Sequence, residues 1–175
     1  MSYIIYSNSM NKVIKNKFLF LPIAYCLLLI SSCTKINVYE KNIVIPKYEW
    51  HSDFSAKGSF AISDTAAEYN IYVVLRHTDA YRYNNIWLNF SSQSPGDSLR
   101  EEKIDLQLGN DATGWLGTGM NDIWEVRELL YGEPRRFRRA GNYSFSIGQI
   151  MRDNPLPNIM SVGLRVEKAG PGAKN

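Results

Sequence analysis

The sequence contains few of the residues on which many protein functions depend. Its 175 residues include two cysteines, Cys26 and Cys33, and two histidines, His51 and His77. Cys26 lies inside an apolar run, so the two thiols make no pair suited to a buried disulfide. Zinc sites use three or four ligands, mostly thiols and imidazoles, and two histidines on separate segments do not supply them. We therefore expect no metal site and no disulfide framework.

A lasting excess of basic residues is also absent. The formal net charge is +3, and Lys12, Lys15 and Lys17 account for it in a 32-residue stretch without Asp or Glu. From residue 33 onward, 17 basic residues face 17 acidic ones. Binding to nucleic acid needs a basic surface that neutralises phosphates. We therefore expect no nucleic-acid partner.

The longest apolar run, residues 18–30 (FLFLPIAYCLLLI), is too short for a stable transmembrane helix. Thirteen helical residues span about 20 Å, against roughly 30 Å for the hydrocarbon core. Three lysines precede the run and Ser31 and Ser32 follow it, which is the layout of a secretory signal peptide. We predict that residues 1–32 are a cleaved signal peptide, with Met10 as an alternative start. A buried core helix is the less favoured interpretation.

The segment Ile30-Ser31-Ser32-Cys33 resembles a bacterial lipobox. The resemblance implies cleavage between Ser32 and Cys33, a diacylglycerol on the Cys33 sulfur and acylation of the new amino terminus. Several acyl chains hold a protein far more firmly than one myristoyl group does. Thr34 and Lys35 resemble neither inner-membrane retention signals nor the acidic run of surface lipoproteins. We therefore expect no cofactor other than the covalent lipid on Cys33, and attachment to the outer membrane, on its periplasmic face.

The remaining chain alternates apolar and polar residues with period two, which is typical of strands with one buried face. Turn signals such as Ser94-Pro95-Gly96-Asp97 separate these segments. We predict an all-β domain at residues 51–168, an antiparallel β-sandwich (immunoglobulin-like or jelly-roll-like) of six to eight strands. Residues 33–50 are expected to be a lipidated tether and an edge strand interrupted by Pro46, and residues 169–175 a disordered tail. The inward positions are expected to be Ile71, Val73, Leu75; Ile86, Leu88, Phe90; Ile104, Leu106, Leu108; Tyr143, Phe145, Ile147; and Val162, Leu164, Val166.

Residues 122–131 (DIWEVRELLY) do not show clean alternation. We expect a short helix or turn there, capped by Asn121 or Asp122, with an irregular strand as the alternative.

Catalytic patterns are weak. The sequence has no Gly-x-Ser-x-Gly elbow, and the glycines of Gly114-Trp-Leu-Gly-Thr-Gly119 do not follow the dinucleotide-binding order. They are better explained by positive φ angles in a turn around Trp115. Nothing in the spacing of the carboxylates sets the separation that a glycosidase needs, and solvated strand edges explain them more simply. We therefore expect that the protein is not an enzyme; the carboxylates considered were Glu101, Glu102, Asp122, Glu125, Glu128 and Glu133.

Two short segments are candidate partner contacts. The first holds four arginines, Arg135, Arg136, Arg138 and Arg139, which suit lipid phosphates, lipopolysaccharide or an acidic protein. Its alternative is a solvated strand end balanced by Glu125, Glu128 and Glu133. The second is Asn154-Pro155-Leu156-Pro157, a stiff bend with few backbone donors. It is either a docking surface or only the connection between the last two strands.

A carbohydrate-binding sandwich is the alternative function. The chain has 22 aromatic residues, including Trp50, Trp87, Trp115 and Trp124, and exposed aromatics in one plane would form a sugar-binding platform. Most of them are expected to pack in the core or across strands.

The chain from Cys33 to about Lys168 resembles the gliding-motility lipoprotein GldH family of Bacteroidetes. This resemblance implies a cell-envelope lipoprotein that serves surface gliding, linked to type IX secretion, as an accessory or scaffold and without a catalytic residue to transfer. It implies other gliding-motility and type IX secretion envelope proteins as partners and no small-molecule substrate. The turn at Asn158-Ile159-Met160 and the four arginines depart from the family pattern. The matching pieces are Val38-Tyr39-Glu40, Trp50, Tyr69-Asn-Ile-Tyr72 with Leu75-Arg76, Trp115-Leu-Gly117 with Gly119 and Asp122-Ile123, Gly141-Asn-Tyr-Ser-Phe-Ser-Ile147, Met151-Arg-Asp-Asn-Pro-Leu-Pro157 and Ser161-Val-Gly-Leu-Arg-Val-Glu-Lys168.

Overall fold

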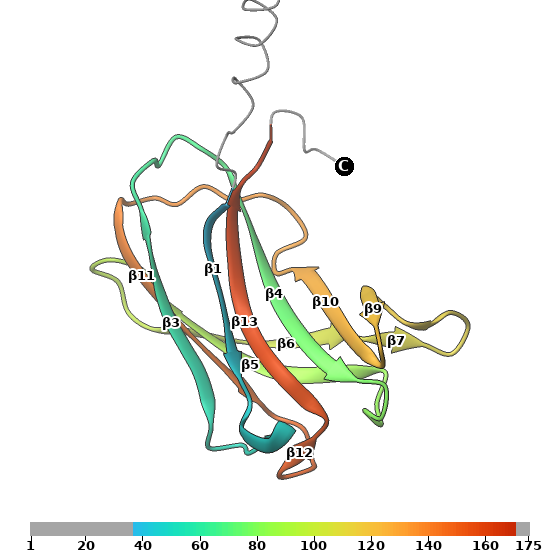
Figure 1. Cartoon of the computed structure of the whole chain (residues 1–175). Coiled ribbons are helices and arrows are strands. Elements are labelled where there is room, and N and C mark those ends of the chain that lie inside the picture. Colours follow the sequence, from blue (N-terminus) through green and yellow to red (C-terminus); the bar gives the residue numbers. More distant parts are fainter. Residues whose placement is uncertain (1–36, 171–175) are drawn as a thin grey trace, which may run out of the picture. The chain divides into compact units, whose positions relative to one another are not determined.

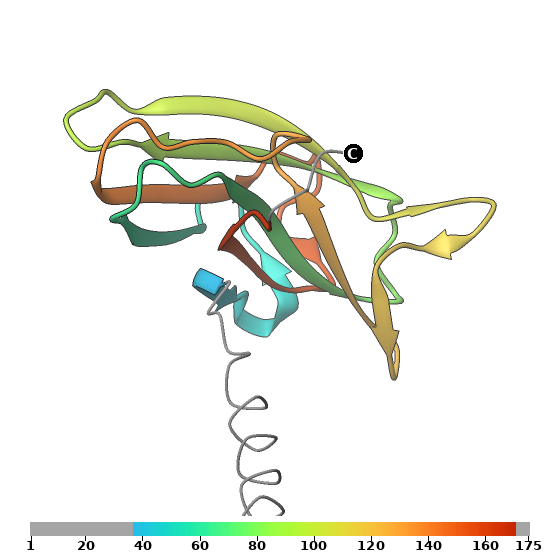
Figure 2. The same cartoon turned by 90° about the horizontal axis from the view of Figure 1, so that it is seen from above.

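Two antiparallel sheets face each other in the computed structural model, which describes residues 37–170 (Figure 1). Figure 2, seen from above, shows them as two layers. The five-stranded sheet has the order β1-β13-β4-β10-β9, with β1 at Asn37–Val44, β13 at Ile159–Lys168, β4 at Tyr69–Thr78, β10 at Ile123–Leu129 and β9 at Thr118–Met120. The four-stranded sheet has the order β3-β11-β5-β6, with β3 at Ser55–Ile62, β11 at Gly141–Gln149, β5 at Asn85–Gln93 and β6 at Arg100–Gln107. The all-β sandwich is therefore confirmed, and its two sheets hold nine strands rather than six to eight.

Shorter elements lie in the connections between the main strands. A single 3-10 turn, η1 (Pro46–Tyr48), begins at Pro46 and leads into β2 (Glu49–Trp50), which pairs with β12 (Leu156–Pro157). A second two-stranded pair joins β7 (Gly109–Asn110) to β8 (Gly114–Trp115).

The core lies between the sheets, where the period-two pattern places it. In β11, Tyr143, Phe145 and Ile147 are buried while Asn142 and Ser144 are exposed. Burying an aliphatic or aromatic side chain contributes about 1.5–3 kcal/mol, so each such strand is held firmly in one register. All of the predicted inward positions are buried except Ile104, which is half-buried.

The strand register defines two ends of the sandwich. At one end, Asn37 pairs with Glu167, and Lys168 pairs with Tyr69. We call this the tether end, because residues 33–36 precede Asn37 in the chain. The ten residues of β4 then run about 30 Å to Thr78 at the opposite, distal end. Strand β1 lies at the edge of the five-stranded sheet, with β13 as its neighbour.

The expectation of a helix or turn at residues 122–131 is wrong. The segment forms strand β10, which pairs with β4 over seven residue pairs and with β9 on its other side. Asn121 and Asp122 do not cap a helix; both have positive φ angles (49° and 63°) and form the two-residue turn between β9 and β10. Such turns need positive φ at both central residues, which Asn and Asp tolerate. Ile123, Val126 and Leu130 have the spacing of one face of a helix, which favoured the helix interpretation. In the strand, Val126 is buried and Trp124 is half-buried.

Several expectations fall outside the described residues. The signal peptide, the cleavage site between Ser32 and Cys33, the lipid on Cys33 and residues 171–175 are among them. Ala169, which we assigned to the tail, donates its backbone N–H to the Glu68 carbonyl at 2.8 Å. Within residues 37–170 no helix is long and apolar enough to cross a membrane.

Candidate functional site

Three of the carboxylates considered as catalytic pairs, Glu101, Glu102 and Glu125, are engaged by other side chains. Glu101 and Glu102 are exposed on β6, and the Tyr131 hydroxyl donates to Glu102 at 2.9 Å. Glu125 lies between Arg76 and Arg127, at 2.5 and 2.7 Å. Burial alone would raise the pKa of Glu125, but the hydrogen bonds from the two arginines outweigh it and the pKa is lowered. Among residues 37–170, no three His, Cys, Asp or Glu side chains come together in a way that suits a metal ion.

The two histidines occupy opposite environments. His51 is exposed, whereas His77 is fully buried on β4. The His77 ring packs against Trp115, with ring centroids 4.5 Å apart, and its Nδ1–H donates to the Thr78 carbonyl at 2.8 Å. Burial lowers the pKa of His77 more than this hydrogen bond raises it. The ring is therefore a neutral, structural group of the core.

The glycine-rich segment bends between the short strands β8 and β9, and two of its glycines have the predicted positive φ angles. Gly114 and Gly117 have positive φ angles of 76° and 82°, a region in which glycine carries no steric cost. Gly119 has another role, because a Cβ there would meet the Trp124 ring at 2.7 Å. The segment shapes the chain around Trp115.

The proline bend lies at the distal end and is tied to the strand pair β2–β12. Leu156 is fully buried opposite Trp50, while Asn154 and Pro155 are exposed and Pro157 is half-buried. The Asn154 Oδ1 accepts the backbone N–H of Ser52 at 3.0 Å. The bend thus connects strands and also presents an exposed, fixed surface.

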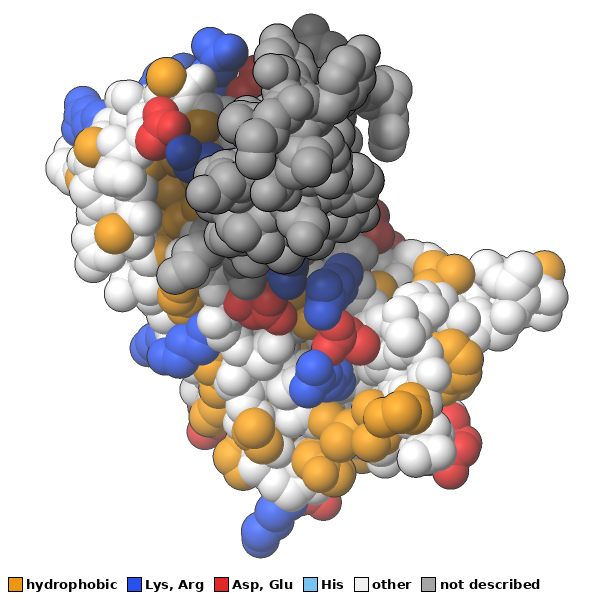
Figure 3. Space-filling view, turned by 45° about the horizontal axis from the view of Figure 1, so that its top comes forward, with side chains coloured by type: hydrophobic (Ala, Val, Ile, Leu, Met, Phe, Trp, Pro, Cys, Tyr) orange, Lys and Arg blue, Asp and Glu red, His pale blue; other side chains and the backbone are white. Residues whose placement is uncertain are grey.

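Exposed apolar side chains concentrate at the same distal end. Val44 is opposite Ser161 and Ile123 is opposite Thr78, so both lie at the distal edge of the five-stranded sheet. The Ile150 N–H donates to the Trp87 carbonyl at 3.0 Å, which places these two beside the β2–β12 pair. Figure 3 shows a group of hydrophobic side chains in the lower part of the view, and several separate groups of Lys and Arg with Asp and Glu among them. The exposed apolar residues of this end are Val44 (67% exposed), Met120 (75%), Tyr48 (45%), Trp87 (42%), Ile150 (41%) and Ile123 (37%).

The arginine segment lies at the opposite, tether end. Arg135 and Tyr69, the first residue of β4, exchange two backbone hydrogen bonds of 2.8 Å each. Figure 1 shows the connection between β10 and β11 at the end where β1 begins. The register gives the same arrangement, since Asn37, Glu167, Tyr69 and Arg135 lie on four adjacent strand segments.

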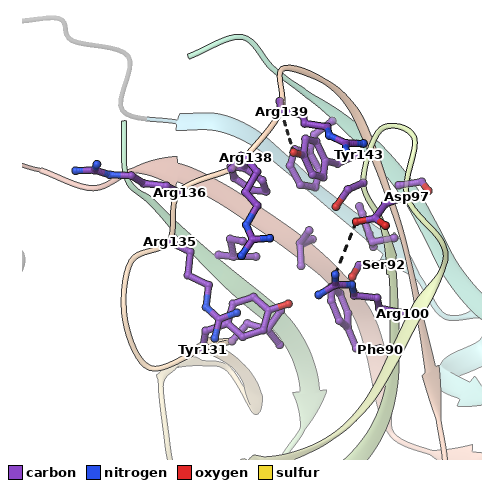
Figure 4. Close-up of a pocket in the computed structure, with 18 residues that line it drawn as sticks. Phe90, Ser92, Asp97, Arg100, Tyr131, Arg135, Arg136, Arg138, Arg139 and Tyr143 are labelled. Atoms are coloured by element: carbon purple, nitrogen blue, oxygen red, sulfur yellow. Dashed lines mark hydrogen bonds and ion pairs between the residues drawn. The ribbon is translucent and has the colours of Figure 1, made fainter. Parts of the chain in front are cut away.

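The arginines line a pocket of about 510 Å³ between the two sheets. In Figure 4, Arg138 extends from the connection into the pocket, and Arg135 and Arg100 reach it from two sides. The floor is apolar and includes Phe60, Phe90, Phe145 and Leu164, all at most 7% exposed. Figure 4 also shows that Arg136 points away from the centre of the pocket.

The arginines of this pocket differ in how far they are neutralised. Arg136 pairs with Glu68 at 3.4 Å and Arg100 with Asp97 at 3.7 Å. Arg139 donates to the carbonyl of Pro95 at 3.0 Å. The Arg135 guanidinium lies 3.7 Å from the centre of the Tyr131 ring.

Arg138 makes no hydrogen bond or ion pair with any residue of the described chain. The three glutamates expected to balance the cluster do not do so, because Glu125 is bound to Arg76 and Arg127, and neither Glu128 nor Glu133 pairs with an arginine of the pocket within residues 37–170. The cluster therefore keeps a positive charge of its own.

Sequence reasoning missed two features of this molecule. Asp97 lies in the turn between β5 and β6 and Arg100 is the first residue of β6, and nothing in the sequence links them to residues 135–139. The distal group of apolar side chains was missed because its members are single residues on different strands. Single apolar residues on a surface are common, so only the fold shows that they gather.

Comparison with known proteins decides the family. The model of the family described as GldH lipoprotein matches residues 37–166, which is most of the chain. The chain belongs to the GldH lipoprotein family. The matched region begins with the first residue of β1 and ends within β13, so it covers both sheets of the sandwich.

Two curated relatives agree with this GldH assignment. The chain is 30% identical over 152 residues to a protein of Christiangramia forsetii named as a gliding motility lipoprotein GldH homolog, covering 83% of this chain and 92% of the relative. It is 28% identical over 148 residues to the gliding motility lipoprotein GldH of Flavobacterium johnsoniae, covering 81% of this chain and 91% of the relative. No solved structure gives a significant match.

Proposed function

We propose that this GldH family member is a lipid-anchored accessory protein of gliding motility, linked to type IX secretion, which acts by holding partner proteins rather than by catalysis. Its membership of the GldH lipoprotein family, whose relatives are named as gliding motility lipoproteins, supports a role in gliding motility. The lipobox supports an anchor on Cys33. Thr34 and Lys35, which resemble neither inner-membrane retention signals nor the acidic run of surface lipoproteins, favour the periplasmic face of the outer membrane.

The observation that carries the scaffolding role is the position of the exposed apolar side chains. Of the eight exposed large hydrophobic residues within residues 37–170, six lie at the distal end, about 30 Å along the strands from the tether end. Such a group of side chains is typical of a protein-interaction surface. A lipid-facing role fits it poorly, because an anchor on Cys33 holds the other end of the domain at the membrane.

The partner that fits the distal end is an envelope protein with a complementary apolar surface. Tyr48, Trp87 and Ile150 offer contacts of the kind that dominate interface energies. Asn154, Pro155 and Pro157 lie beside them and give the surface a stiff margin.

The glycan-binding alternative receives less support. A sugar platform needs two or three exposed aromatic rings in one plane on one sheet face. Among the described residues, the large aromatic side chains that are well exposed are Tyr48 and Trp87, and they come from η1 and β5.

Deletion of the gene, followed by complementation, tests the proposal. The deletion strain should lose colony spreading and secretion of type IX cargo, and the wild-type gene should restore both. The double variant Met120→Glu with Ile150→Glu should not restore spreading or secretion, because it places charges on the distal apolar surface. Its protein level should remain normal, because substitutions of exposed residues change stability little. Leu99→Glu, an apolar residue 57% exposed on the β5–β6 hairpin, is the matched control and should complement fully. Normal spreading and secretion in the deletion strain would contradict the proposal.

A further inference from the structure

The pocket at the tether end combines a cationic rim with an apolar floor. Among the residues that line it are five arginines and one carboxylate, that of Asp97. The floor is built from core side chains such as Phe90, Phe145 and Leu164. A ligand that satisfies both parts must carry a negative charge next to a short apolar segment. The headgroup and first carbons of an anionic phospholipid have this chemistry.

The strand register places this pocket near the tether. Neighbouring strands lie about 4.8 Å apart, so the three steps from Asn37 through β13 and β4 to Arg135 cover about 15 Å. Cys33 precedes Asn37 by four residues, which span at most about 14 Å when fully extended. A lipid on Cys33 therefore keeps the arginines within reach of the bilayer surface.

We propose that this pocket binds the phosphate group of an anionic phospholipid in the membrane that holds the anchor. The proposal rests on lipidation of Cys33, which belongs to the proposed function. Arg138 is the central ligand, since it points into the pocket and has no hydrogen bond or ion pair within residues 37–170. Arg135 and Arg100 flank it, and the glycerol and first acyl carbons lie against the aromatic floor.

Two features of the pocket suit this ligand. Arginine presents several N–H donors in a fixed plane, which matches the oxygens of a phosphate. Arg135 is braced on the Tyr131 ring, and its backbone is fixed to Tyr69, so its guanidinium is held at the rim before any ligand binds. Such preorganisation lowers the entropy lost on binding.

An acidic segment of a partner protein is the competing ligand. The position of the pocket disfavours it, because a domain held at Cys33 turns this end towards lipid and leaves the distal end free. The two surfaces therefore bind different partners: phospholipid binds at the arginines, and an envelope protein binds at the distal apolar residues.

The test uses the mature lipoprotein purified in micelles of an uncharged detergent. Mass spectrometry first establishes the lipid on Cys33; its absence would overturn both this inference and the proposed anchor. Soluble dihexanoyl phosphatidylglycerol is then titrated against the protein by calorimetry, with dihexanoyl phosphatidylcholine, inorganic phosphate and a hexaglutamate peptide as further probes. We expect saturable binding of phosphatidylglycerol that is roughly tenfold or more tighter than that of the other three.

Two double variants complete the test. Arg135→Gln with Arg138→Gln should weaken phosphatidylglycerol binding roughly tenfold or more. Arg82→Gln with Arg152→Gln removes the same charge from exposed arginines at the distal end and should leave binding unchanged. Equal binding of the two lipids, equal effects of the two variants, or tighter binding of phosphate or hexaglutamate would overturn the inference. None of these binding outcomes alters the deletion experiment, so failure of lipid binding is distinguishable from failure of the proposed function.

Discussion

Tyr69 and Arg135 exchange two backbone hydrogen bonds of 2.8 Å, although 66 positions separate them in the chain. This pair fixes the arginine segment to the first residue of β4, beside Lys168 at the end of β13. The domain consequently differs between its ends: five arginines line a pocket at the tether end, and exposed apolar side chains gather at the distal end. The division of roles between membrane and partner follows from this arrangement.

Tyr69 should be important for stability mainly through its ring. It is 2% exposed, its ring centroid lies 5.2 Å from that of Phe137, and its hydroxyl donates to the Asp64 carbonyl at 2.7 Å. Tyr69→Phe removes one hydrogen bond and should lower the free energy of unfolding by about 1 kcal/mol. Tyr69→Ala leaves a cavity and should cost about 3–5 kcal/mol. Urea unfolding of both variants measures the difference, and equal losses would contradict this account of the tether end.

His77 should make stability depend on pH. Burial lowers its pKa in the folded state, so the unfolded chain binds the proton more readily. Stability is then complete above the unfolded-state pKa of about 6.5 and falls as the pH drops below it, by at most about 1.4 kcal/mol per pH unit.

Urea midpoints measured between pH 7.5 and 5.5 check this expectation. His77→Gln should remove the dependence in that range, which lies above the titration of ordinary carboxylates. His51→Gln replaces the exposed histidine and should leave the pH dependence of stability unchanged. A flat profile for the unsubstituted protein would show that His77 is not held neutral.

Gly163 should be required for the close approach of β1 to β13. A Cβ at this position would lie 2.0 Å from the Lys41 carbonyl oxygen, so Gly163→Ala must push the edge strand outward. We expect a loss of about 1–3 kcal/mol, as for other overpacked sites. Gly170→Ala, where nothing lies within 4 Å, should change the free energy of unfolding by less than about 0.5 kcal/mol. Thermal unfolding compares the two variants. Similar unfolding midpoints would contradict the prediction, because they would show that β1 can move away from β13 without loss of stability.

The alternation of apolar and polar residues was sufficient to predict most of the sandwich. Ile71, Val73 and Leu75 face the core as expected, and so do Tyr143, Phe145 and Ile147. Period-two patterns succeed here because each strand has one face against the other sheet. The pattern did not predict strand β10, because buried and exposed side chains alternate only partly along it. Its backbone groups are paired with β4 on one side and with β9 on the other.

The candidate surfaces were less accessible to sequence reasoning. The four arginines at 135–139 stand out as a cluster, but their distance from Arg100 and the apolar floor depends on how two sheets close over one another. The buried state of Leu156 within the proline bend likewise depends on pairing with Trp50, far away in the chain. Contacts of this kind are set by tertiary packing, and local sequence carries no signal for them.

The most direct test of the account is photo-crosslinking in living cells from two matched positions. A benzophenone amino acid replaces Ile150 at the distal end or Val38 at the tether end, residues that are 41% and 37% exposed. The account predicts a covalent adduct with an envelope protein from position 150 and none from position 38, in cells that spread and secrete normally. A protein adduct from position 38, with none from position 150, would contradict it.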